Sequence, residues 1–343
     1  MNQRQHMSGD QNKARIAWYR SPVDRETMAL LNQRSDWKGL RQTLGHLGLL
    51  ALTAATAWYA AERRLLPVLL LALFLHGTFY AFLLNGFHEL CHKSVFKSKT
   101  LNTLFLDVFS FLGGFNPVLF WTSHQEHHKY TLHPPDDLEV VLPVSLTRTS
   151  FLKSAVINPW EAVRWLKQVI RLSFGRLEGE WENALFPESS VDSRRKLFTW
   201  ARILLVGHAL LVGVSLYFHL WLAPVLVTLA PFYGGWLLYL CNNTQHAGLQ
   251  DKVPDYRLCC RTILLNPFLR FVYWQMNYHT EHHMYAAVPC YNLGKLHGHI
   301  KSDLPHCPVG LRETWGQLSA ILQKQQTDPL YQYAPELPIR PAS

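Results

Sequence analysis

Nine histidines gathered in four short clusters give this chain its strongest chemical signal. Two clusters share the pattern H-x-x-H-H, and positions i, i+3 and i+4 of a helix lie on one face. Three imidazoles on one face suit a metal ion, because neutral imidazole is a common ligand of iron, zinc and copper. The clusters are HELCH with His88 and His92, HQEHH with His124, His127 and His128, NNTQH with His246, and HTEHH with His279, His282 and His283.

The size of this set predicts two metal ions. Nine ligands exceed one coordination sphere, and a structural zinc site takes only four. Imidazole-rich coordination with open positions favours iron, which can bind O2. Asn242 lies one helical turn before His246 and is a candidate for holding a metal-bound water. Neutral ligands call for nearby carboxylates that orient the imidazole rings. The candidates are Glu89, Glu126, Asp136, Asp137 and Glu281.

The elements that must position these residues are long apolar segments. The chain has 343 residues, 48% of them hydrophobic, and apolar runs alternate with polar stretches. About 20 apolar residues in a helix cross the hydrocarbon core of a bilayer. Four spans are predicted, at residues 42–61, 65–87, 201–222 and 223–241. Residues 101–120 are apolar but interrupted by Gly113, Gly114 and Pro117, which favours an interfacial or re-entrant segment.

Basic residues predict how the chain lies in the membrane. The first 41 residues carry eight Lys and Arg, and residues 88–197 and the C-terminal part carry more. Such residues favour the cytoplasmic side, so four spans place both termini and all four clusters there. The membrane would be a bacterial inner membrane or the endoplasmic reticulum. The excess charge of +9 is spread along the chain, which fits anionic lipids better than nucleic acid.

The predicted fold class is therefore an all-α integral membrane protein with four transmembrane helices and a cytoplasmic helical cap. The cap carries the histidine clusters. Residues 1–324 would form one membrane domain, and residues 325–343, with four prolines, an irregular tail. Four further histidines within apolar segments are expected to stay neutral and to hydrogen-bond neighbouring helices. They are His46, His76, His208 and His219, whereas His297, His299 and His306 are expected at the surface.

Two other classes of protein remain open at this point. HELCH satisfies the H-E-x-x-H pattern of zinc proteases, with Glu89 as general base. That interpretation explains two histidines and leaves seven without a role. A non-catalytic membrane scaffold that needs a metal is the other alternative. Iron content and dependence on O2 would separate both of them from an oxygen-activating enzyme.

The order of HELCH, HQEHH, NNTQH and HTEHH resembles the membrane fatty-acid desaturase and hydroxylase family over roughly residues 65–310. The resemblance implies a non-haem di-iron centre, with the nine histidines as ligands of two Fe2+ and Asn242 bound through a water. It implies O2-dependent desaturation of a fatty acyl-type lipid, or hydroxylation of an acyl, sphingolipid or small amphiphilic substrate. The chain lacks the HPGG motif of cytochrome b5. Electrons are therefore expected from a separate ferredoxin or cytochrome b5-type protein.

Overall fold

The computed structural model describes residues 15–339, and within this range the chain forms helices and no β-strand. The predicted all-α fold is confirmed. The helices are α1 (Arg25–Leu31), α2 (Asp36–Glu62), α3 (Leu66–Ala81), α4 (Leu83–Cys91), α5 (Lys99–Gly113), α6 (Pro117–Tyr130), α7 (Arg148–Ala155), α8 (Pro159–Ser173), α9 (Gly179–Leu185), α10 (Val191–Tyr217), α11 (Leu222–Leu226), η1 (Ala230–Phe232), α12 (Trp236–Asn242), α13 (Tyr256–Cys259), α14 (Pro267–Val272), α15 (His279–Met284), α16 (Cys290–Ile300), η2 (Lys301–Asp303) and α17 (Gly310–Thr327).

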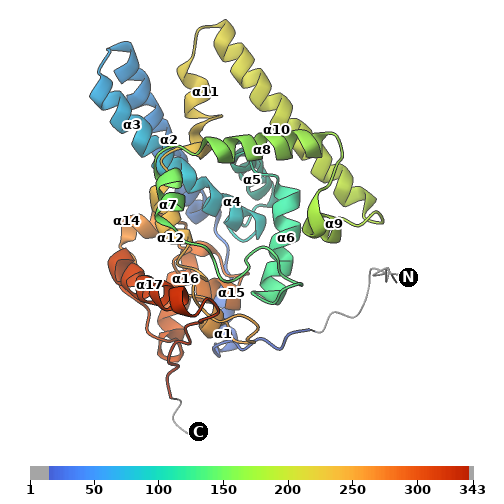
Figure 1. The fold of residues 1–343 in the computed structure, drawn as a ribbon, viewed down its shortest axis with the longest axis vertical. Helices are drawn as coiled ribbons and strands as arrows, with labels where there is room; N and C mark the ends of the chain where they lie inside the picture. Colours follow the sequence, from blue (N-terminus) through green and yellow to red (C-terminus); the bar gives the residue numbers. More distant parts are fainter. Residues whose placement is uncertain (1–14, 340–343) are drawn as a thin grey trace.

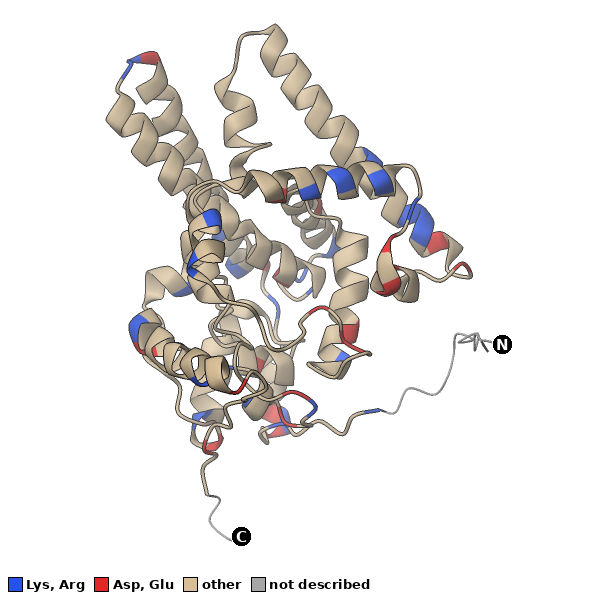
Figure 2. Cartoon of the chain, viewed as in Figure 1, with Lys and Arg blue, Asp and Glu red and all other residues tan. Residues whose placement is uncertain are grey.

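Three helical stretches of the described chain are long and apolar enough to cross a membrane: α2, α3 together with α4, and α10. Their most apolar windows have mean hydropathies of 1.2 to 2.0, yet only 22% to 39% of those windows is buried. Apolar surface left exposed on this scale needs lipid around it. Figure 1 shows α2 with α3, and α10 with α11, as two arms that leave the cap on the same side. In Figure 2 the arms are almost free of charged residues except at their ends.

A fourth crossing exists if α5 and α6 are counted as one span, and these two helices are bent by 103°. The bend lies where the sequence predicts an interruption. Gly114 ends α5 in the left-handed region, with φ of +70°, which glycine adopts at little cost. Pro117 then starts α6, and the Asn116 side chain caps its first turn. The re-entrant character of this segment stays a prediction.

The prediction of a single helix over residues 223–241 is wrong. The chain returns from the tip of α10 through α11, η1 and α12, with irregular turns between them. Pro231 cannot donate a backbone hydrogen bond, and Gly234 takes a left-handed φ of +69°. The segment packs closely on α3, where a Cβ on Gly77 would lie 2.5 Å from the Tyr233 carbonyl oxygen. Packing against α3 therefore explains part of the apolar character of residues 223–241.

Three of the four histidines in apolar segments hydrogen-bond other segments, as predicted. Each brings Nε2 within 2.8 to 3.0 Å of a backbone carbonyl: His46 of Phe79, His76 of Leu226, and His208 of Phe111. Such bonds fix the helices against one another without a buried charge. The prediction is wrong for His219, which is exposed at the end of α10.

The cap surrounds the inner ends of α4 and α6, and α1 and α17 lie at the end away from the arms (Figure 1). Its core includes Phe87 and Leu90 of α4 and Leu293 and Leu296 of α16. The first three residues of the predicted tail belong to α17, and residues 328–339 form no helix. The Tyr333 backbone N–H donates to the Gly248 carbonyl at 2.8 Å, so this stretch lies on the cap. Residues 340–343 of the predicted tail lie outside the described residues.

The close approach at Gly77 yields a testable prediction. Gly77→Ala should lower the free energy of unfolding by about 1–3 kcal/mol, because the added methyl group overlaps a carbonyl that cannot easily move. The matched control is Gly48→Ala in α2, where nothing lies within 4 Å of the new Cβ. Higher helix propensity should stabilise the control by up to about 1 kcal/mol. Unfolding in detergent would measure both, and equal midpoints would contradict the packing described.

Candidate metal centre

All nine histidines converge at one place in the cap. They come from the end of α4, from α6, from the turn after α12 and from α15. Seven of them are buried, and His92 and His128 are partly buried. They form two adjoining groups. In each group the candidate ligand atoms lie within 4.8 Å of one another: His88, His92, His124, His128 and His282 in the first, and His246, His279, His283 and Cys260 in the second.

Short contacts between ring nitrogens hold the first group. Nε2 of His124 lies 2.7 Å from Nε2 of His88 and 3.0 Å from Nε2 of His128. Nε2 of His128 lies 3.2 Å from Nε2 of His282. The ring of His92 lies 4.7 to 5.2 Å from those of His88, His124, His128 and His282. The five side chains of the first group thus bring their ring nitrogens close to one point.

The second group is smaller and borders the first. Nε2 of His246 lies 2.9 Å from Nε2 of His279. The His127 ring lies 5.1 Å from that of His246 and 4.9 Å from that of His283, so His127 is on the side of this group. Each H-x-x-H-H cluster is therefore divided. His124 and His128 belong to the first group and His127 faces the second.

Three carboxylates accept hydrogen bonds from Nδ1 atoms of these rings. Glu89 lies 3.2 Å from Nδ1 of His88, Glu139 lies 2.8 Å from that of His124, and Asp137 lies 2.8 Å from that of His127. A neutral imidazole that donates from Nδ1 has an unprotonated Nε2. The 2.7 Å contact between His88 and His124 thus brings two lone pairs together, which is repulsive unless a cation lies between them.

Two more observations show that these residues fit metal ions. Nε2 of His92 and Nε2 of His283 are buried and have no hydrogen-bond partner among residues 15–339. Buried polar atoms are normally paired, so these two unpaired nitrogens indicate a place where a metal ion fits. The donor set is mainly imidazole, as iron, zinc and copper prefer, and carboxylates hold the rings from behind.

Burial keeps four histidines of the two groups neutral, whereas the hydrogen bond and charge of Asp137 outweigh burial at His127 and raise its pKa. Burial lowers the pKa of His246 to about 3, with repulsion from His127 as a further cause. The pKa values of His279, His282 and His283 are well below the ordinary value for the same reasons, burial first and neighbouring histidines second. All four rings are therefore unprotonated at neutral pH and can bind a cation without losing a proton.

The carboxyl group of Asp137 is ionised in spite of its burial. Burial alone would raise its pKa, but hydrogen bonds from His127 and from the backbone N–H groups of Leu132 and Glu139 outweigh this and lower it. The Cys260 thiol is different, because burial and the neighbouring Cys259 raise its pKa well above the usual value. Without a metal ion, this thiol is protonated at neutral pH.

The five carboxylates predicted to orient the imidazole rings have different surroundings in the structure. Glu89 and Asp137 contact cluster histidines. Glu281 is predicted to orient a cluster imidazole, but the hydrogen bonds that it accepts come from Thr262 and, at 2.6 Å, from His297. It follows His279 by two positions on α15 and so points away from the ring face. His297 is consequently partly buried, contrary to the prediction.

Glu126 pairs with Lys129, and the Asp136 backbone N–H donates to His133; their orienting role stays a prediction.

Sequence reasoning missed two residues of the site. Glu139 lies in the loop after α6, where no periodicity points to it, although the run DDLE offers a third acid beside Asp136 and Asp137. Cys260 lies directly after α13 and reaches the second group by tertiary folding alone. Asn242, the predicted water-mediated ligand, accepts a hydrogen bond from Asn85 at 3.3 Å. Its role toward a metal stays a prediction.

Comparison with known proteins agrees with this geometry. The model of the family described as fatty acid desaturase matches residues 64–315, most of the chain. The Delta(6)-fatty-acid desaturase fat-3 of Caenorhabditis elegans is 25% identical over 242 residues, which are 62% of this chain and 54% of that protein. This chain thus spans about half the length of that relative. With the family match over the segment that holds every histidine cluster, the protein belongs to the fatty acid desaturase family.

Proposed function

We propose that this protein is a membrane desaturase that uses O2 and two histidine-bound irons to place a double bond in an acyl-type lipid. The observation that carries the proposal is the pair of adjoining imidazole groups, with unprotonated nitrogens aimed inward, in a chain of the desaturase family. The overall reaction removes two hydrogens from adjacent carbons. Together with two electrons and two protons from outside, these reduce one O2 to two waters.

The residues divide into two sets of ligands. His88, His92, His124, His128 and His282 would hold one iron, and His127, His246, His279 and His283 the other. Cys260 is within reach of the second set, and Asn242 would act through a water. Bound iron supplies the ability to activate O2 once electrons arrive.

The protein's own residues supply positioning and a dry environment. Glu89, Glu139 and Asp137 fix the tautomer and orientation of three rings, so the Nε2 atoms need no rearrangement. Burial excludes water, which would otherwise compete for open metal positions. The Phe120 ring stacks on His124 with centroids 4.9 Å apart and separates the first group from an adjoining cavity. A lipid chain held in that cavity would meet the site in one orientation.

We place the site at the cytoplasmic face of a bacterial inner membrane or of the endoplasmic reticulum. Both arms leave the cap on one side, and the histidines lie in the cap, within reach of a soluble partner (Figure 1). Electrons would come from a separate ferredoxin or cytochrome b5-type protein. Hydroxylation stays the alternative within the family. The zinc protease is disfavoured, because Glu89 lies against His88 and 3.5 Å from Nδ1 of His282 in a site shared by nine histidines.

His282→Ala should abolish desaturation, because it removes a ligand from the first group and leaves buried nitrogens unpaired. Lipid profiles of a desaturase-deficient host, with and without O2, would measure the activity. Metal analysis of the wild type should give about two irons per chain. Membrane insertion of the variant should be retained, and His299→Ala, an exposed histidine, is the control. One zinc per chain, or full turnover of His282→Ala, would contradict the proposal.

Asp137→Asn tests the carboxylates separately from the ligands. An amide cannot accept all three hydrogen bonds that Asp137 receives, so the His127 ring loses its fixed tautomer. Iron affinity should fall by roughly 10–100-fold, as for other metal sites that lose an orienting carboxylate. The control is Glu313→Gln, where the carboxylate also contacts a histidine, His306, but at the exposed surface. Competition with a chelator would measure both variants, and equal affinities would refute the role of Asp137.

A further inference from the structure

A large cavity of about 1160 Å³ begins beside the first histidine group. This volume exceeds the roughly 300–1,000 Å³ of ordinary small-molecule sites. Phe87, Phe120, Ser123 and Glu139 line its inner part. Glu139 is the residue that holds His124, and the Phe120 ring lies 5.9 Å from that of His88. A molecule in the cavity therefore reaches the candidate metal centre.

The inner walls of the cavity suit a hydrocarbon chain. They are formed mainly by aromatic and aliphatic side chains from α4, α6, α10 and η1. A second cavity of about 360 Å³ shares Gly113, Phe115, Pro231 and Phe232 with the first and continues to Asn242. The two cavities therefore adjoin, and their combined space has room for a long apolar chain.

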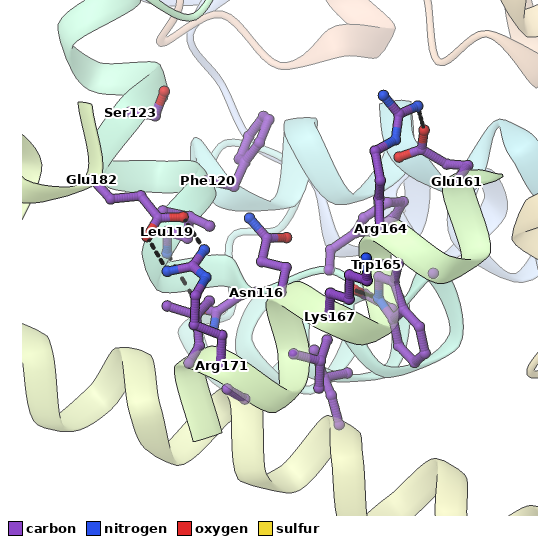
Figure 3. A pocket seen from close by; sticks show the side chains of 18 of the residues that line it. Asn116, Leu119, Phe120, Ser123, Glu161, Arg164, Trp165, Lys167, Arg171 and Glu182 are labelled. Carbon is purple, nitrogen blue, oxygen red and sulfur yellow. Dashed lines mark hydrogen bonds and ion pairs between the residues drawn. The ribbon is translucent and has the colours of Figure 1, made fainter. Parts of the chain in front are cut away.

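Figure 3 shows Phe120 and Ser123 of α6 on one side of the cavity and the basic side chains of α8 on the other. Two of the three are paired with carboxylates. Arg164 pairs with Glu161, and Arg171 lies 2.6 Å from Glu182 and 3.1 Å from Glu178. Only Lys167, among the lining cations, forms no ion pair within residues 15–339. The lining holds three basic and four acidic residues and so has no positive excess.

The N-termini of α8 and α9, which lie at the opening of this cavity, are also unfavourable for binding phosphate. An N-terminus binds anions through free backbone N–H groups and the helix dipole. Here the first turn of α8 carries Glu161, and the first turn of α9 carries Glu180 and Glu182. These carboxylates already interact with the positive helix ends. A polyphosphate group such as that of coenzyme A would meet carboxylates at both helix N-termini.

The opening of the cavity also lies where a bilayer surface is expected. Helix α8 packs on α10 through one buried stripe, and a second stripe of large apolar residues is exposed. The exposed residues follow helical spacing: Trp160, Val163, Leu166, Ile170 and Phe174. A helix with separate apolar and charged stripes lies in the plane of the membrane interface. The cavity therefore opens at the level of the lipid head groups.

We infer that this cavity takes one acyl chain of an intact bilayer lipid whose head group has no net charge, and that it discriminates against acyl-coenzyme A. The inference rests on the proposed function and names its class of substrate. The mixed, mutually paired charges can contact a zwitterionic or hydroxylated head group through both signs. Several unpaired cations would be needed for the phosphates of a thioester substrate.

Binding to metal-free protein tests this inference without any turnover. The probes are a phosphatidylcholine, a ceramide and an acyl-coenzyme A that carry the same dibrominated acyl chain, which quenches nearby tryptophan fluorescence. The Trp165→Phe variant identifies quenching that comes from the cavity, because Trp165 lines it. Phosphatidylcholine or ceramide should bind at least tenfold more tightly than the coenzyme A ester, and the two lipids compared with each other identify the head group. Equal or tighter binding of the ester, or no quenching that depends on Trp165, would overturn the inference.

Charge variants make the test sharper. The double variant Glu161→Gln with Glu178→Gln frees Arg164 and removes one of the two carboxylates that contact Arg171. It should tighten binding of the coenzyme A ester at least fivefold. Glu26→Gln with Glu188→Gln changes the net charge equally at exposed positions outside the lining and should have no such effect. A similar change in both pairs would refute the role of the opening. Desaturation with preferred ester binding would refute only this inference, whereas lipid binding without desaturation would refute only the proposed function.

Discussion

The convergence of unprotonated imidazole nitrogens in a dry space is the constraint on which the rest of the cap depends. Carboxylates behind the rings turn Nε2 inward, and the 2.7 Å approach of His88 to His124 is unfavourable without a cation between them. Burial adds to this, because it lowers the pKa of His88 to about 3 and removes protonation as a way to relieve the repulsion. Metal binding and cap packing are therefore coupled.

Helix geometry explains how one sequence pattern contributes to two histidine groups. Successive residues of a helix are about 100° apart, so His127 and His128 cannot aim at the same point. On α6 they face different groups, and on α15 His282 and His283 do the same. Both helices thus form walls shared by the two groups. The H-x-x-H-H spacing keeps those groups adjacent.

The nine histidines could be identified from the sequence as candidate metal ligands, because their spacing is local and depends on helix geometry alone. Long apolar runs likewise located α2, α3 with α4, and α10. The fourth apolar run was misassigned, since composition does not distinguish a segment packed on α3 from one that faces lipid. The partners of Glu139, Glu281 and Cys260 are set by tertiary folding. Glu139 lies in a loop, which has no sequence periodicity that could indicate where its side chain points. On a helix as short as α15, the direction of the Glu281 carboxylate depends on the residues packed around it.

One break in the chain relates the metal centre to the cavity. Gly114 ends α5 and so determines where α6 presents His124. Its carbonyl also accepts a hydrogen bond from Nε1 of Trp165 at 2.7 Å, which ties α8 to the same point. A Cβ at this position would lie 2.7 Å from that nitrogen, so the contact needs glycine for space as well as for its positive φ. The position of the ligand helix α6 and that of the cavity wall α8 therefore both depend on this one glycine.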